Sequence, residues 1–143
     1  MKTVTTVAGF LLAVSAFAGG SDPKVPAPAY PLKAETNFIA KVADMREVGK
    51  ESALAGIYLS VTNKNGETVN VYVGPKEFVK LFDVTFKVGL ELEITGAKVK
   101  FDGGDVILSR EIKFGRITLT LRDEDGWPNW DYNKPRGRIT TGL

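Results

Sequence analysis

Apolar and polar residues alternate along most of the chain between residues 37 and 122. In the segment 56–62, for example, Ile57, Leu59 and Val61 are each separated by one polar or aromatic residue. Because successive side chains of a strand point to opposite faces, a period of two predicts strands with one buried face. The pattern predicts six strands, at residues 38–48, 56–62, 67–73, 90–99, 106–113 and 116–122. In the last of these, Ile117, Leu119 and Leu121 are expected to face the core.

The segment between the third and fourth predicted strands has a different period. Gly74-Pro75 ends the alternation, and Phe78, Leu81 and Phe82 follow at the spacing of one helix face. Proline is favoured in the first turn of a helix, so a short amphipathic helix is expected to begin here and to cap an open end of the sheet. One helix between strands three and four is the plan of the oligonucleotide/oligosaccharide-binding (OB) barrel. The predicted fold class is therefore all-β, a small OB-like barrel of five to six strands over residues 37–132.

The N-terminus predicts export. Met1-Lys2 precedes a short apolar run that ends in Ser15-Ala16-Phe17-Ala18, the pattern of a cleaved signal peptide over residues 1–18. The run is too short for a membrane span of about 20 residues, so no span is expected after cleavage. Residues 19–36 are rich in proline and are expected to form an extended arm, either solvated or lying on the domain or a neighbour. Residues 133–143 form a basic tail that we expect to be flexible.

The amino-acid composition excludes several kinds of catalytic and metal-binding site. The 143-residue chain contains no histidine and no cysteine. A Ser-His or Cys-His nucleophile, a thiolate metal site and a disulfide are therefore excluded, and we expect no enzyme activity, no cofactor and no metal. The formal net charge is +2, which argues against indiscriminate binding of nucleic acid, because that requires many uncompensated basic residues.

Four short strings carry a resemblance to a family. They are Val73-Gly74-Pro75 before the apolar helix, and the segments 89–96, 106–112 and 119–128. With these strings the chain resembles the small exported bacterial OB-fold proteins of the periplasmic type, over about residues 38–130. The resemblance implies a periplasmic or extracellular binding protein, and by fold analogy nucleic-acid binding. Fold alone does not determine function.

An OB barrel binds its ligand across the outer face of strands two and three, between the loops that follow strands one and four. The residues at these positions are predicted to face outward or to lie in the second loop: Tyr58, Ser60, Thr62, Asn70, Tyr72 and Lys100. The two tyrosines offer stacking surfaces for a base or a sugar ring. Tyrosine and threonine are also common on an ordinary exposed strand face, and that alternative stays open.

A second candidate site follows the last strand. Aromatic residues and arginines gather there and could form a platform for a carbohydrate or a protein, or could fold back as a plug over the barrel: Arg116, Arg122, Trp127, Trp130 and Tyr132. Residues 123–126 (Asp-Glu-Asp-Gly) have the start of a calcium loop but lack its later bidentate glutamate.

These observations predict an exported, non-catalytic binding or interaction module. Its partner is expected to be an oligosaccharide, a single-stranded oligonucleotide or an envelope protein. The alternative is a structural subunit of an envelope or extracellular assembly, in which the terminal arms pair with neighbouring subunits and form an oligomer.

Overall fold

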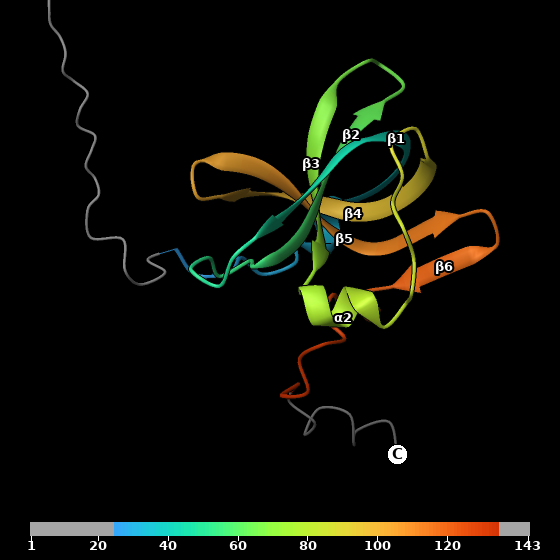
Figure 1. Ribbon diagram of the computed structural model, residues 1–143. Helices are drawn as coiled ribbons and strands as arrows, with labels where there is room; N and C mark the ends of the chain where they lie inside the picture. Colours follow the sequence, from blue (N-terminus) through green and yellow to red (C-terminus); the bar gives the residue numbers. More distant parts are fainter. Residues whose placement is uncertain (1–24, 135–143) are drawn as a thin grey trace, which may run out of the picture.

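The computed structural model describes residues 25–134, which form one six-stranded sheet and one short α-helix (Figure 1). The elements in chain order are the 3-10 turn η2 (Leu32–Ala34), β1 (Glu35–Val48), β2 (Gly56–Asn63), β3 (Thr68–Gly74), α2 (Lys76–Lys80), β4 (Glu91–Phe101), β5 (Gly104–Phe114) and β6 (Ile117–Thr120). The predicted signal peptide and all but the first two residues of the predicted basic tail lie outside the described residues. No helix within residues 25–134 is long and apolar enough to cross a membrane.

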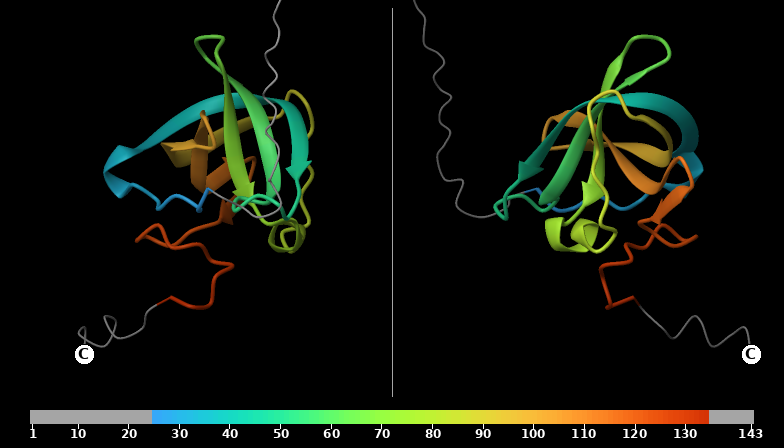
Figure 2. Two further views of the ribbon diagram at one scale, coloured as in Figure 1. Left: turned by 90° about the vertical axis from the view of Figure 1, so that its left-hand side faces the viewer. Right: turned by 45° about the vertical axis from the view of Figure 1, so that its right-hand side comes forward.

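The sheet closes into a ring. Its strand order is β3-β2-β1-β4-β5-β6, and β3 also pairs with β5 in parallel through Val71 with Ile107 and Tyr72 with Leu108. Figures 1 and 2 show the strands wrapping around a common interior. The prediction of an all-β fold with one short helix between the third and fourth strands is confirmed.

β1 and β4 each pair with two other strands, and each has a register shift in one of these pairings. β1 pairs with β4 through its first half and with β2 through its second half, and its register shifts between Val42 and Asp44. The pairing of β4 with β5 shifts register between Thr95 and Gly96, where Arg110 of β5 is the extra residue. Gly96 is required at this position, because a Cβ atom there would come within 2.6 Å of the Leu108 carbonyl oxygen.

The interior of the ring is filled by the residues that the alternation assigns to one face. Leu59, Val61 and Val71 are fully buried, as are Leu92 and Ile94 on the opposite strand. Phe78 and Phe82 of the helical segment pack against this main core. α2 lies at one end of the ring, at the same end as the segment that follows β6 (Figure 2).

Two residues predicted to be buried are exposed. Leu81 is 77% exposed, because α2 ends at Lys80 and Val79 occupies the buried position instead. Ile117 is 43% exposed, because it begins the short edge strand β6, which pairs on one side only. Leu119 and Leu121 are buried as predicted.

Candidate functional site

Tyr58 and Tyr72 lie on the predicted outer face of β2 and β3, but this face is covered. Their exposed fractions are 4% and 3%, and they form a second hydrophobic cluster with Leu54, Val106 and Leu108. The prediction that the two rings face solvent is therefore wrong. The covering material is the loop between β1 and β2, residues 49–55, together with Tyr30 of the N-terminal arm and Trp130.

Both tyrosine hydroxyls hold the covering loop in place. The Tyr58 hydroxyl donates to the Leu54 carbonyl oxygen and the Tyr72 hydroxyl donates to the Ala55 carbonyl oxygen, each at 2.8 Å. Burial raises the pKa of both phenols above the ordinary value for tyrosine, so both remain neutral donors over the physiological range. These hydrogen bonds fix the position of the loop that borders the site.

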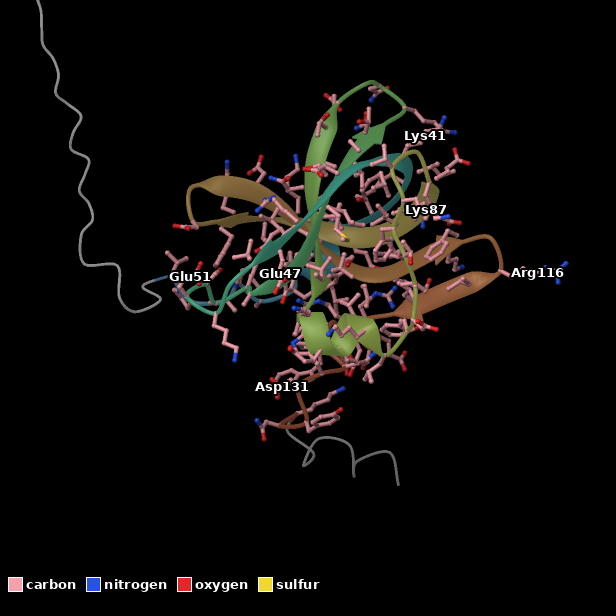
Figure 3. All side chains as sticks on the ribbon, viewed as in Figure 1. Lys41, Glu47, Glu51, Lys87, Arg116 and Asp131 are labelled. Carbon is pink, nitrogen blue, oxygen red and sulfur yellow. The ribbon has the colours of Figure 1, made fainter. Side chains whose placement is uncertain are left out.

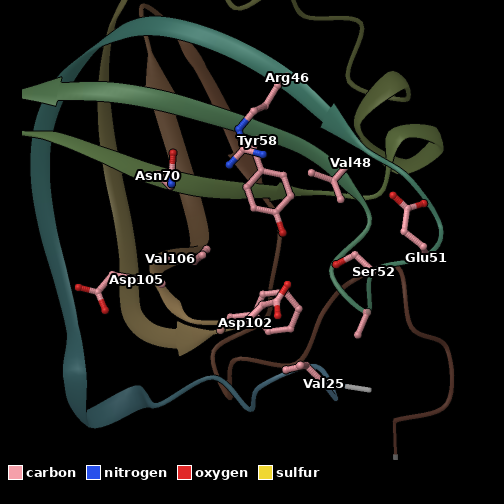
Figure 4. Close-up of a pocket in the computed structure, with 13 residues that line it drawn as sticks. Val25, Arg46, Val48, Glu51, Ser52, Tyr58, Asn70, Asp102, Asp105 and Val106 are labelled. Carbon is pink, nitrogen blue, oxygen red and sulfur yellow. The ribbon is translucent and has the colours of Figure 1, made fainter. Parts of the chain in front are cut away.

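Arg46 closes the remaining access to the Tyr58 ring. Its guanidinium carbon lies 4.7 Å from the ring centroid, and the two residues are paired across β1 and β2 (Figure 4). A cation placed over an aromatic face is attracted to the ring, so Arg46 occupies the surface on which a base or sugar would stack. Stacking on Tyr58 therefore requires Arg46 to move.

An open pocket of about 560 Å³ remains between the two loops that border this face. The β1–β2 loop forms one wall, the turn between β4 and β5 (residues 102–103) forms the other, and Tyr58 and Asn70 lie at the strands between them (Figure 4). Its lining residues come from six segments: Val25; Arg46 and Val48; Glu51, Ser52 and Ala53; Tyr58; Asn70; and Phe101, Asp102, Gly104, Asp105 and Val106. We call this the loop pocket.

The loop pocket carries more acidic than basic side chains. Glu51, Asp102 and Asp105 line it, against the single arginine Arg46. Lys100 does not line the pocket; its Nζ lies 3.0 Å from Asp105 Oδ1, and this hydrogen bond lowers the pKa of Asp105. The pocket therefore offers carboxylate acceptors more than it offers positive charge.

The other predicted ligand residues divide between two places. Asn70 lines the loop pocket, and the Ser60 hydroxyl lies 3.4 Å from its Oδ1 atom. Thr62 pairs with Thr68 at the far end of β2 and β3 and contributes to a different, smaller depression beside Lys41. The strand face is thus not one continuous site.

The sequence pattern does not place Arg46 on this face. A strict period of two from Ala40 and Val42 would place it inside the ring, but the register shift between Val42 and Asp44 moves it to the face of Tyr58. A bulge leaves no clear mark in the sequence, so the alternation alone could not find this residue.

The structure brings three of the five predicted platform residues together: Arg122, Trp127 and Trp130 line one cavity, and Arg116 and Tyr132 do not line it. Trp130 packs against both hydrophobic clusters, with its ring 5.2 Å from Phe78 and 6.2 Å from Tyr72. Arg122 is buried at 5% exposure, whereas Tyr132 is 82% exposed. Arg116 lies at the β5–β6 turn, away from the end of the molecule that carries Asp131 (Figure 3).

Residues 123–126 form a turn closed by side-chain hydrogen bonds. Asp123 Oδ1 accepts from the backbone N–H groups of Asp125 and Trp127, and Lys134 Nζ donates to Asp123 Oδ2 at 2.6 Å and to Asp125 Oδ2 at 3.0 Å. The Lys134 ammonium group thus takes the place that a calcium ion would occupy beside these two carboxylates. Within residues 25–134 there is no cluster of three or more His, Cys, Asp or Glu residues arranged for a metal.

The stability of this turn should depend on pH. Burial opposes the charge of Asp123, but hydrogen bonds from Lys134 and from the two N–H groups outweigh it and hold its pKa below the usual value. A carboxyl group with a lower pKa in the folded than in the unfolded state stabilises the fold at pH values above its unfolded pKa of about 3.9. This contribution is lost as the pH falls through the folded pKa. The free energy of unfolding of Asp123→Asn should therefore be below that of the wild type at pH 7, and the difference should shrink below about pH 4. Urea unfolding of both proteins across this range measures it, and a constant difference would contradict the ion pair.

Comparison with known proteins supplies one match. A model of the MamS/MamX magnetosome protein family, a bacterial family, matches residues 35–119. The match runs from the first residue of β1 into β6 and includes every lining residue of the loop pocket except Val25. No curated protein and no solved structure matches the chain.

Proposed function

Because the chain belongs to the MamS/MamX magnetosome protein family, we propose that it is a non-catalytic binding module of the bacterial envelope or the magnetosome. Its ligand would occupy the loop pocket. The observation that carries the proposal is the pocket itself, an open cavity of about 560 Å³ with hydrogen-bonding side chains on three sides. Cavities of roughly 300–1,000 Å³ are typical of small-ligand sites.

The position of the pocket supports this assignment. The parallel β3–β5 pairing and the single helix after β3 fit an OB-type ring. Ligands of OB folds cross strands two and three between the first and the fourth connecting loops. The loop pocket lies at this place, because its walls are the β1–β2 loop and the β4–β5 turn.

The chemistry of the pocket favours a neutral oligosaccharide among the predicted ligands. Asp102, Asp105 and Asn70 can accept hydrogen bonds from sugar hydroxyls, and hydrogen bonds to charged acceptors are the stronger kind. An oligonucleotide would bring phosphates toward three carboxylates, of which one is paired with Lys100, and only one arginine. It would also not find the Tyr58 ring open for stacking, since Arg46 covers it.

Asp102 allows a sharp test of this proposal. It is exposed, lines the pocket and has a φ of +50°. Asparagine has nearly the same size and also tolerates this conformation, so Asp102→Asn should remove the charge without disturbing the turn. We expect a neutral trisaccharide such as maltotriose, cellotriose or chitotriose to bind the wild type, and Asp102→Asn to weaken binding about tenfold, or about 1.4 kcal/mol. Isothermal titration calorimetry measures both.

The matched control is Asp83→Asn. Asp83 is also exposed and has a φ of +54°, but it follows α2 and does not line the loop pocket. The Asp83→Asn protein should bind the trisaccharide with the affinity of the wild type. A single-stranded oligothymidylate is the competing probe. The proposal fails if none of the trisaccharides binds, if both variants weaken binding equally, or if the oligothymidylate binds more tightly than any sugar.

Export and assembly enter the proposal as supporting expectations. The apolar N-terminal run of the sequence favours export to the periplasm or beyond. The arm within residues 25–34 packs on its own domain through Tyr30, which joins the second hydrophobic cluster. The contacts of this part of the arm therefore favour a binding module over an assembly built by exchange of N-terminal arms.

A further inference from the structure

Within residues 25–134, Arg122 is a buried cation that forms no ion pair with a carboxylate. Arg122 is 5% exposed. Its Nη1 donates a hydrogen bond of 3.0 Å to the Gly126 carbonyl oxygen. Its Nε is buried and has no hydrogen-bond partner in the part of the chain that the structure describes. A buried charged group normally has both a counter-charge and a full set of hydrogen bonds, because desolvation is costly.

The contrast with Arg110 shows what is missing. Arg110 Nε donates to Glu35 Oε2 at 2.8 Å, and its Nη2 lies 2.7 Å from the same oxygen. Arg122 instead lies against two aromatic rings, with its guanidinium carbon 5.4 Å from the centroids of both Tyr30 and Trp130. Aromatic faces attract a cation but accept no strong hydrogen bond at Nε. Desolvation accordingly lowers the pKa of Arg122 below the ordinary arginine value.

Arg122 lines a cavity of about 480 Å³. Three segments far apart in the sequence enclose it: the N-terminal arm at residues 27–30, the β1–β2 loop at Ala53 and Leu54, and the C-terminal segment at residues 125–131. Its walls are mainly apolar and aromatic, and they include Tyr30, Tyr72 and the two tryptophans. We call it the arm cavity. Its size is within the range of small-ligand sites.

We propose that the arm cavity binds a small organic monocarboxylate, whose carboxylate accepts a hydrogen bond from the Arg122 guanidinium and whose apolar body lies between the aromatic walls. A carboxylate is the group that completes a guanidinium both electrostatically and geometrically. Asp125 and Asp131 also line the cavity, and they repel the more highly charged phosphate more strongly than a monocarboxylate. Burial of the apolar walls against an apolar ligand is favourable, so an organic acid should bind more tightly than an inorganic ion.

This site is separate from the loop pocket. Tyr30, Arg122, Trp127 and Trp130 all lie outside residues 35–119, the part matched by the family model. The two cavities share Ala53 only, among the residues that line them. Binding of a carboxylate in the arm cavity can therefore succeed or fail independently of sugar binding in the loop pocket.

The arginine Nε–Hε resonances offer a direct readout in the full chain. With ¹⁵N-labelled arginine, Arg122 reports on the arm cavity and Arg110, already paired with Glu35, is an internal reference. We expect benzoate to shift the Arg122 Nε–Hε signal with a saturable dependence, reaching half-saturation below about 1 mM, while Arg110 stays unchanged. Benzamide has the same ring without the charge and should produce at most a small shift, and inorganic phosphate should produce none.

Two matched variants locate the effect. Ala29 is exposed and lines the cavity, so Ala29→Leu should obstruct it without disturbing the core, and should weaken benzoate binding at least about tenfold. Ala34 is also an exposed alanine of the arm, in η2, but does not line the cavity, so Ala34→Leu should bind as the wild type does. An unshifted Arg122 signal would overturn the proposal, as would equal shifts with benzamide or phosphate, or equal affinities of the two variants.

Discussion

Replacing Gly56 with alanine should lower the free energy of unfolding by about 3–5 kcal/mol, enough to unfold a marginal domain. Gly56 begins β2 with a φ of +136°, a conformation that alanine adopts only under strain. An added Cβ would overlap the Gly74 carbonyl oxygen and would lie 2.7 Å from the Gly74 carbonyl carbon and from Pro75 Cα. All three are backbone atoms, so the overlap is relieved only by moving the end of β3 and the start of α2.

Gly66→Ala is the control for the backbone strain alone. Gly66 has a φ of +81° in the β2–β3 turn, and an added Cβ would find no atom within 4 Å. This substitution should cost about 1 kcal/mol. Urea unfolding of the wild type and both variants measures the two costs. If Gly56→Ala proves as stable as Gly66→Ala, the close approach of β2 to Gly74 is not present in solution.

The ring could be predicted because most of its strands obey one rule. Leu59 and Val61 on β2 and Leu92 and Ile94 on β4 alternate with polar positions, and all four are buried in the core. The helix was predicted from an equally local signal, proline followed by apolar residues at helical spacing. Such rules fail where an element ends, which is why Leu81 beyond α2 and Ile117 at the start of β6 are exposed.

The candidate site was predicted less completely, because its shape depends on segments that have no period. The two bordering loops were predicted from the strand order, and the structure places an open pocket between them. The cover over Tyr58 and Tyr72 comes from residues 49–55, Tyr30 and Trp130, whose packing no alternation encodes. Outward-pointing tyrosines in a strand carry the same sequence pattern whether solvent or a loop lies above them. Arg46 was missed for a related reason, since a bulge reverses the pattern without a signal of its own.

Replacing Tyr72 with alanine should lower the free energy of unfolding by about 3–5 kcal/mol, an effect expected of a core residue and not of an exposed ligand-stacking residue. The Tyr72 ring is 3% exposed and packs against Tyr58 at 5.1 Å and Trp130 at 6.2 Å between ring centroids. Its removal would leave a cavity where the β1–β2 loop and the C-terminal segment meet β3. The same substitution would free the Ala55 carbonyl oxygen from its hydrogen bond.

Two further variants divide this effect into its parts. Tyr72→Phe keeps the ring and loses only the hydroxyl that donates to Ala55, so it should cost about 1 kcal/mol. Thr68→Ala, at an exposed position of the same strand, should change the free energy of unfolding by less than about 0.5 kcal/mol. Denaturant unfolding of the three variants, monitored by tryptophan fluorescence, gives the series. A Tyr72→Ala protein as stable as Thr68→Ala would mean that the loop and the C-terminal segment do not cover the ring, and the outer face of β3 would then be open for stacking.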